Sequence, residues 1–180
     1  MRITGGTSRG IQLKVPTSNL VRPTTDRTRE AIFSMLAARL QNWSRGLDLF
    51  AGTGALGIES LSRGMDWVDF VDQEPRCCAI IKQNLTKAGL IRRAHVYCLS
   101  VSKALSVLDG NYDVIFIDPP YKDTILGDLL IQLDGSKLVT SDSLIVISHA
   151  SRSSLMYQYD TLHQIKSKKH GDTSISIYAR

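Results

Sequence analysis

Four residues near the middle of the chain could bind a planar base together with its exocyclic amine. They are Asp118-Pro119-Pro120-Tyr121, and they follow an apolar run that ends at Ile117. Such a run is typical of a buried parallel strand, and the two prolines prevent both a longer strand and an immediate helix. The Asp118 carboxylate and the Pro119 carbonyl can accept hydrogen bonds from an amine, and the Tyr121 ring can stack on a base. We therefore predict a binding site at the carboxyl end of this strand, although a plain turn has a similar composition.

A glycine-rich turn after an earlier strand forms a second candidate site. The segment 50–57 reads Phe-Ala-Gly-Thr-Gly-Ala-Leu-Gly and leads into a predicted helix. Glycines let the backbone approach a nucleotide closely and leave the amino end of the following helix open to it. Asp72 ends the next predicted strand, where a carboxylate can accept hydrogen bonds from ribose hydroxyls. The predicted cofactor contacts are Phe50, Ala51, Gly52, Thr53, Gly54, Gly57, Asp72, Ser100 and Asp118.

The glycine spacing alone does not identify the nucleotide. Gly52-x-Gly54-x-x-Gly57 also matches the pattern of dinucleotide-binding enzymes, so an NAD-dependent activity is one alternative. Two features favour S-adenosylmethionine. Residues 1–46 precede the first strand of the pattern, and the segment 118–121 has no evident use in hydride transfer. A methyl donor needs a ribose partner and space for its methionine end rather than a phosphate cradle.

The elements that must position these residues alternate along the chain. Predicted strands cover 47–50, 67–72, 95–98, 112–117, 143–148, 162–166 and 174–178. The first predicted helix begins at 24–27, and further predicted helices cover 58–63, 74–88, 101–108 and 124–133. This alternation with short connections indicates an α/β fold with a doubly wound, mostly parallel sheet. Gly171-Asp172 predicts a hairpin between the last two strands, so one of them is expected to run antiparallel.

The first 24 residues are expected to form a basic arm, and residues 25–180 the main domain. Arg2–Thr4 and Gln12–Val15 are predicted to pair as a small hairpin, which is too thin to be stable unless it lies on the main domain. The net charge of +5 favours a polyanionic partner. The basic residues proposed to contact its phosphates are Arg9, Lys14, Arg22, Arg27 and Arg29. The competing interpretation is that these charges are ordinary solvated side chains.

Other classes of protein find little support in the sequence. No run of about 18 apolar residues that could span a membrane is present, and residues 1–6 lack the apolar segment of a signal peptide. Cys77, Cys78 and Cys98 fit no metal-binding spacing, so no metal is expected, and they are interpreted as small apolar residues in a reducing compartment. We expect a cytoplasmic monomer.

Three segments together resemble the RsmD family of bacterial 16S ribosomal RNA guanine-N2 methyltransferases. They are the segment 22–30, which reads RPTTDRTRE, the glycine-rich segment 50–57, and Asp118-Pro119-Pro120-Tyr121. The first is specific to the family, whereas many amino methyltransferases share the other two. The likeness extends from Gly5-Gly6 to Gly171-Asp172-Thr173. It implies a seven-stranded, Rossmann-like, S-adenosylmethionine-dependent methyltransferase fold with a small N-terminal β extension. It also implies methylation of guanine 966 of 16S rRNA on the small ribosomal subunit.

Two positions depart from the family pattern. Ser100 stands after the third strand where many relatives carry Asp or Asn before Ala to meet the adenine ring, so it offers only a hydroxyl. His170 stands where relatives often have Tyr, and it is a further candidate RNA contact. Two alternatives stay open: an adenine-N6 or other amino methyltransferase acting on DNA or another RNA, and an RNA-binding assembly factor with weak turnover.

Overall fold

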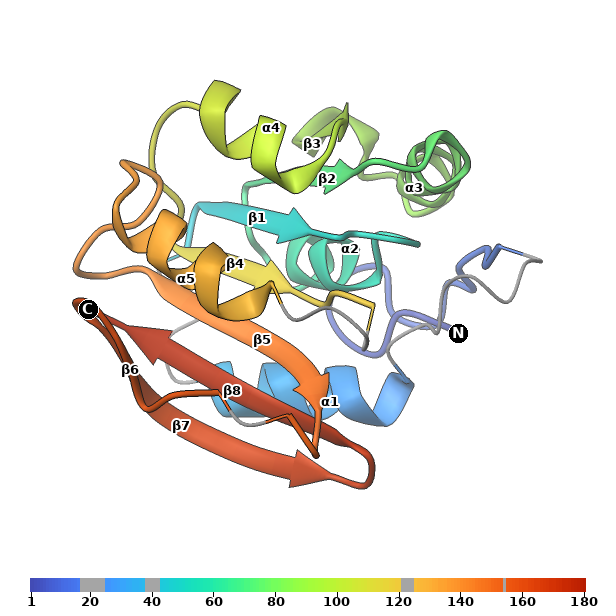
Figure 1. The fold of residues 1–180 in the computed structure, drawn as a ribbon. Helices are drawn as coiled ribbons and strands as arrows, with labels where there is room; N and C mark the ends of the chain where they lie inside the picture. Colours follow the sequence, from blue (N-terminus) through green and yellow to red (C-terminus); the bar gives the residue numbers. More distant parts are fainter. Residues whose placement is uncertain (17–24, 38–42, 121–124, 154) are drawn as a thin grey trace.

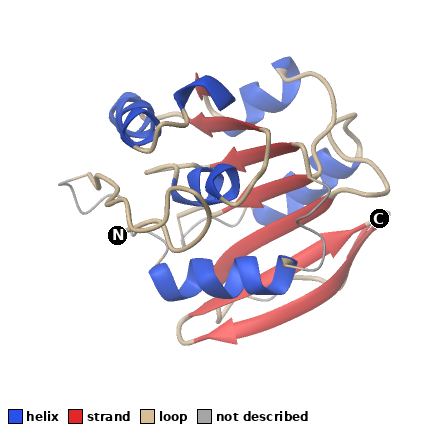
Figure 2. Ribbon diagram, turned by 180° about the vertical axis from the view of Figure 1, so that it is seen from behind, coloured by secondary structure: helices blue, strands red, loops and turns tan. Residues whose placement is uncertain are grey.

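One eight-stranded sheet with helices on both faces makes up the fold (Figures 1 and 2). The computed structural model describes residues 1–16, 25–37, 43–120, 125–153 and 155–180. The strands are β1 (Arg45–Leu49), β2 (Trp67–Asp72), β3 (Ala94–Cys98), β4 (Val114–Ile117), β5 (Leu144–Ala150), β6 (Gln158–Tyr159), β7 (Leu162–His170) and β8 (Thr173–Ala179). The helices are α1 (Asp26–Leu36), α2 (Ala55–Ser62), α3 (Pro75–Lys87), η2 (Ile91–Arg93), α4 (Val101–Val107) and α5 (Leu126–Asp134).

The sheet order is β3-β2-β1-β4-β5-β8-β7-β6. Strands β1 to β5 are parallel to one another, whereas β8 is antiparallel to β5 and β7 is antiparallel to β8. The predicted α/β class and the predicted antiparallel strand are therefore confirmed. The sheet has one strand more than the family resemblance implied, because the two-residue strand β6 pairs with β7 at the edge. A strand that short leaves no periodic pattern in a sequence.

Each face of the sheet has its own apolar core. Helices α1, α2 and α3 cover one face, where Phe33 and Phe116 lie with ring centroids 5.9 Å apart. Helices α4 and α5 cover the other face, where Leu129 and Leu133 pack with Ile117. Side chains of β4 are therefore buried on both faces, as its run of apolar residues predicted. This burial fixes the direction of β4 and with it the position of the segment that follows.

Helix α1 begins where the sequence predicted. The Thr25 side chain accepts a hydrogen bond from the Thr28 amide at 3.2 Å and so caps the helix. Ile32, Phe33 and Leu36 of the helix are buried in the core. The helix thus covers the part of one face of the sheet that β4, β5 and β8 form (Figure 2).

The N-terminal arm is fastened to the main domain. Its predicted hairpin is present only as one antiparallel bridge between Arg2 and Gln12. Ile3 and Leu13 are both buried in the core of the α1 face. The Ser8 hydroxyl donates to the Ala88 carbonyl at 3.1 Å, which ties the arm to the end of α3. The described part of the arm therefore has a fixed place on the α2 and α3 side of the sheet. In the part of the chain that the structure describes, no helix is long and apolar enough to cross a membrane.

Candidate active site

The sheet order brings the predicted site residues to one edge. The glycine-rich turn follows β1, Asp72 ends β2, Ser100 follows β3 and Asp118 follows β4. These four strands are adjacent and parallel, so their carboxyl ends share one edge of the sheet. The chain runs outward from β1 through β2 to β3 and then returns to pair β4 on the other side of β1. Ligands of open α/β sheets bind at such a switch point.

The turn after β1 has a backbone that only particular residues adopt. Phe50, Gly52 and Gly54 have φ angles of 57°, 55° and 76°. A positive φ is uncommon for a bulky residue such as Phe50, and strained residues of this kind gather at functional sites. The Ala51 amide donates to the Val71 carbonyl at 3.0 Å, which holds the turn against β2. Gly54 is the N-cap residue of α2 and has no side chain, so no side-chain hydrogen bond caps the amino end of that helix.

Asp72 is held in a defined orientation. One carboxylate oxygen accepts from the Gly52 amide at 2.8 Å and the other from the Glu74 amide at 2.9 Å. A carboxylate oxygen can accept more than one hydrogen bond, so both oxygens keep capacity for hydroxyl donors. The predicted ribose partner is thus fixed beside the glycine-rich turn, although no ribose contact itself is tested.

Asp48 is a site residue that sequence analysis did not single out. Its carboxyl group is 1% exposed on β1 and accepts a hydrogen bond from the Gly57 amide at 2.9 Å. Burial raises the pKa of Asp48 well above its usual value, and the negative charges of Asp118 and Asp72 raise it further against that hydrogen bond. This favours a neutral, protonated Asp48 beneath two acidic neighbours. An acidic residue inside an apolar strand was the signal in the sequence.

Close packing between α2 and β2 requires a glycine at position 57. A Cβ atom at this position would lie 2.3 Å from Cε1 of Phe70, closer than real Cβ contacts. The glycine therefore allows α2 to pack directly on β2, as the third glycine of nucleotide-binding patterns does. Its amide already donates to Asp48. The predicted cofactor contact of Gly57 has no separate support from this geometry.

The segment after β4 is only partly described. Asp118 is half-buried, Pro119 is buried and Pro120 is exposed. Tyr121 lies outside the described residues, so its stacking role stays a prediction. Ser100 begins α4, where its hydroxyl accepts from the Lys103 amide at 3.3 Å. That capping bond leaves the exposed Ser100 hydroxyl one hydrogen to donate to a ligand.

Comparison with known proteins gives full-length matches. A family model described as "Conserved hypothetical protein 95" matches residues 1–179. A putative rRNA methyltransferase, YlbH of Bacillus subtilis, is 36% identical over 183 residues, which cover 100% of this chain and 99% of the relative. Ribosomal RNA small subunit methyltransferase D of Escherichia coli is 30% identical over 182 residues, with 100% and 90% covered. The chain belongs to the RsmD family.

The fold of this RsmD protein agrees with a solved structure. The putative methyltransferase yhhF from Escherichia coli superposes with a TM-score of 0.87 at 28% identity, covering 100% of this chain and 97% of that one. The Rossmann-like methyltransferase fold predicted from the sequence is thereby confirmed.

The residues predicted to contact RNA differ in their exposure to solvent. Arg9, Lys14 and Arg27 have exposed side chains, as such a contact requires. Arg22 lies outside the described residues. His170 is half-buried at the end of β7, and its Nε2 atom is buried without a hydrogen-bond partner in the described part of the chain. No RNA contact of these residues is tested by the structure.

The prediction for Arg29 is wrong. Its side chain is 0% exposed, so it cannot reach a phosphate on the surface. The guanidinium group instead donates to Asp26 Oδ1 at 2.8 Å and lies with its Nε 3.8 Å from Glu59 Oε2. Glu59, also 0% exposed, accepts from the amide and the hydroxyl of Thr4 at 2.9 and 2.7 Å. We call this group, Asp26, Arg29, Glu59 and Thr4, the buried charge cluster. It joins α1, α2 and the arm.

Proposed function

We propose that this protein transfers a methyl group from S-adenosylmethionine to the N2 amine of a guanine in 16S rRNA. The family site, guanine 966, is the proposed target, and the small subunit under assembly is the proposed substrate. The observation that carries the proposal is the position of Asp118-Pro119, which directly follows β4, the strand that pairs with β1 and so ends beside the strained turn. The full-length similarity to proteins named as rRNA methyltransferases supports the substrate class.

The cofactor would lie along the turn and the ends of β2 and β3. Asp72, whose carboxylate accepts hydrogen bonds from the Gly52 and Glu74 amides, would also accept hydrogen bonds from the two ribose hydroxyls. Residues 50–54 would follow the methionine end with backbone atoms, and the Ser100 hydroxyl would donate to the adenine. When bound, S-adenosylmethionine supplies an electrophilic methyl group on a sulfonium. The protein's part is to bind and orient it.

Asp118 and Pro119 would act on the target amine. The lone pair of guanine N2 is delocalised into the ring, so the amine is a poor nucleophile. The Asp118 carboxylate and the Pro119 carbonyl can accept the two N–H groups and so favour a tetrahedral nitrogen with a free lone pair. The carboxylate also stabilises the positive charge that develops on nitrogen during attack. The N2 proton then leaves to Asp118 or to water, and positioning supplies much of the acceleration.

Asp48 sets the charge beneath this site. Burial raises the pKa of Asp48 and so favours its protonated, neutral form, which would add no third negative charge beside Asp72 and Asp118. Its bond to the Gly57 amide holds α2, and therefore the turn, in register with β1. Its proposed role is positioning, since no contact with substrate is assigned to it.

The basic arm would bring the RNA to this edge. We propose that residues 1–24 contact RNA phosphates while residues 25–180 form the catalytic domain. The exposed Arg9, Lys14 and Arg27 and the net charge of +5 support this. Tyr121 would stack on the extruded guanine. A cytoplasmic monomer is sufficient for this activity.

Mapping of the methylated nucleotide tests the proposal. Small subunits from cells that lack the gene would be incubated with the purified protein and labelled S-adenosylmethionine, and the product nucleoside identified by mass spectrometry. The proposal predicts N2-methylguanosine at guanine 966. N6-methyladenosine would support the adenine alternative instead. Cofactor binding without any transfer would support the assembly factor.

A further inference from the structure

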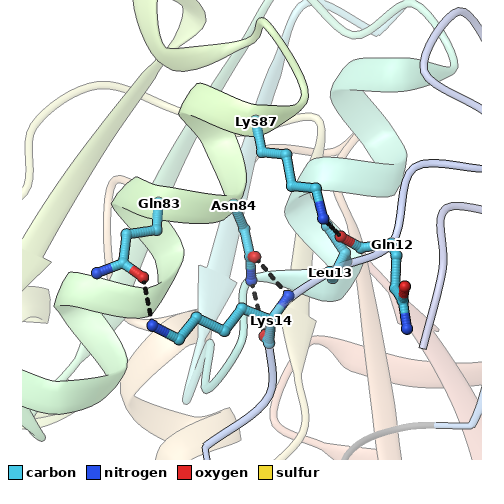
Figure 3. A pocket seen from close by; sticks show the side chains of 6 residues that line it. All are labelled: Gln12, Leu13, Lys14, Gln83, Asn84 and Lys87. Atoms are coloured by element: carbon cyan, nitrogen blue, oxygen red, sulfur yellow. Dashed lines mark hydrogen bonds between the residues drawn. The ribbon is translucent and has the colours of Figure 1, made fainter.

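A pocket outside the candidate active site lies between the N-terminal arm and α3. Its volume is about 390 Å³, within the lower range of small-ligand pockets, roughly 300–1,000 Å³. The residues that line it are Gln12, Leu13, Lys14, Gln83, Asn84 and Lys87 (Figure 3). Three come from the arm and three from the second half of α3. The pocket therefore exists only because the arm is docked on the helix.

Asn84 forms the polar floor of this pocket. Its side chain is 1% exposed, and it accepts from the Lys14 amide at 2.7 Å and donates to the Lys14 carbonyl at 3.0 Å. The same Nδ2 group donates to the Thr53 carbonyl at 2.9 Å. One buried amide thus joins the arm, α3 and the glycine-rich turn. Leu13, 4% exposed, adds an apolar wall.

The rim of the pocket carries the ammonium groups of Lys14 and Lys87. Lys14 Nζ donates to Gln83 Oε1 at 2.9 Å, and Lys87 Nζ donates to the Gln12 carbonyl at 2.7 Å (Figure 3). None of the ion pairs between described residues includes either lysine, and none of the lining residues is acidic. An ammonium group has three donors, so each lysine keeps two for a ligand.

These features select an anion. Two ammonium groups held by neutral acceptors repel metal cations, and the lining offers no carboxylate to bind one. Figure 3 shows the two ammonium groups on opposite sides of Asn84, so each lysine can donate its remaining N–H groups to phosphate oxygens at its own end of the pocket. The link from Asn84 to Thr53 places this anion site directly behind the turn of the candidate active site.

We propose that the pocket contacts the phosphate backbone of the RNA substrate through Lys14 and Lys87. This rests on the proposed function for the identity of the RNA, and it assigns a contact to α3, outside the basic arm. The contact is independent of base sequence and anchors the RNA strand while its target base is at the other end of the turn. Lys14 acts here as half of a two-lysine site rather than as an isolated arm charge.

Salt-dependent binding of in vitro transcribed 16S rRNA tests the pocket. The double variant Lys14→Gln/Lys87→Gln is expected to flatten the log–log salt slope by at least about 0.7–0.9, the value for one phosphate contact. Extrapolated from 1 M to 0.1 M salt, this slope corresponds to a roughly five- to eightfold weaker affinity. Lys82→Gln is the matched control, because Lys82 is an exposed lysine of α3 that does not line the pocket. It should leave the slope within error of wild type.

A charge-gain variant keeps the test valid if the double variant folds poorly. Gln12→Lys adds a charge at the rim while keeping the backbone carbonyl that Lys87 uses. It should steepen the salt slope. The proposal is overturned if the folded double variant binds like wild type, if Lys82→Gln weakens binding equally, or if Gln12→Lys leaves the slope unchanged. It is also overturned if wild-type protein does not bind the RNA.

Methyl transfer distinguishes this inference from the proposed function. If wild-type protein binds rRNA with the expected loss in the double variant but methylates no guanine, the proposed function fails and the pocket stands. If it methylates guanine N2 and the double variant binds normally, the pocket fails and the function stands. A melting curve for each variant shows which losses reflect folding.

Discussion

Neutralising Glu59 in the buried charge cluster should destabilise the protein strongly. Glu59→Gln keeps the size of the side chain but removes the charge that faces the Arg29 guanidinium, and both side chains are 0% exposed. Breaking a buried ion pair by removing one partner costs about 3–5 kcal/mol, because the other charge stays buried. Arg29 keeps Asp26 at 2.8 Å, and its Nε lies 3.8 Å from Glu59, so we expect the lower end, about 3 kcal/mol.

Thermal and urea unfolding measure this effect directly. For a chain of this size each kcal/mol shifts Tm by about 2–4 °C, so Glu59→Gln should lower Tm by about 6–12 °C. Hydrogen exchange at the Thr4 amide should also become faster, because that amide donates to Glu59. The matched control is Asp109→Asn, which neutralises a carboxylate in an exposed pair with Lys137 and should leave Tm unchanged. A Tm for Glu59→Gln equal to that of wild type would refute the reasoning.

Two further substitutions test the cofactor edge. Asp72→Ala removes the carboxylate proposed to accept hydrogen bonds from both ribose hydroxyls, an interaction worth about 1.5–3 kcal/mol. S-adenosylmethionine should therefore bind roughly 10- to 150-fold more weakly, as measured by calorimetry. An unchanged Kd would instead favour NAD as the cofactor or another residue as the ribose partner. Because burial raises the pKa of Asp48 well above its usual 3.8, the folded protein holds a proton that the unfolded chain releases, and wild-type stability should fall as pH rises from about 4 towards that raised pKa. Asp48→Asn should lack this fall in urea unfolding between pH 4 and 8, and equal pH profiles would count against a protonated Asp48.

Strand ends were predictable because their signals are local. The run before Asp118 is apolar on both faces, and prolines end it, so the strand and its direction follow from the chain itself. Asp72 and the glycine-rich turn were predicted for the same reason. Once the order of adjacent strands is known, these residues must share an edge. The sequence did not reveal the role of Gly57, which leaves the space that the Phe70 ring on β2 occupies.

Arg29 shows why clustering of charges along the chain does not by itself indicate an RNA contact. It stands three, four and seven residues before Ile32, Phe33 and Leu36, which are the buried positions of α1. Helical spacing therefore indicated a core-facing arginine, and a charge in that place requires a buried partner. That partner, Glu59, is 30 residues away and on another helix, so only the tertiary structure reveals it.

The pocket between the arm and α3 illustrates the same limit. Lys14 was assigned to RNA because of its basic neighbours, whereas Lys87 gave no signal in the sequence. The two face one pocket because Asn84 pairs with the Lys14 backbone, a contact across 70 residues. Contacts of this kind depend on docking of whole elements, which periodicity does not encode.

Turnover of the Asp118→Ala variant tests the central claim most directly. Labelled methyl transfer to small subunits from cells lacking the gene would be measured for wild type and variant, alongside S-adenosylmethionine affinity. Loss of a preorganised acceptor at the reacting amine should lower the transfer rate by roughly 10²–10³-fold. The cofactor Kd should change far less, because the other predicted cofactor contacts, Asp72 and the turn among them, are intact. Near-normal transfer by Asp118→Ala, or a wild-type product methylated elsewhere than guanine N2, would contradict the account.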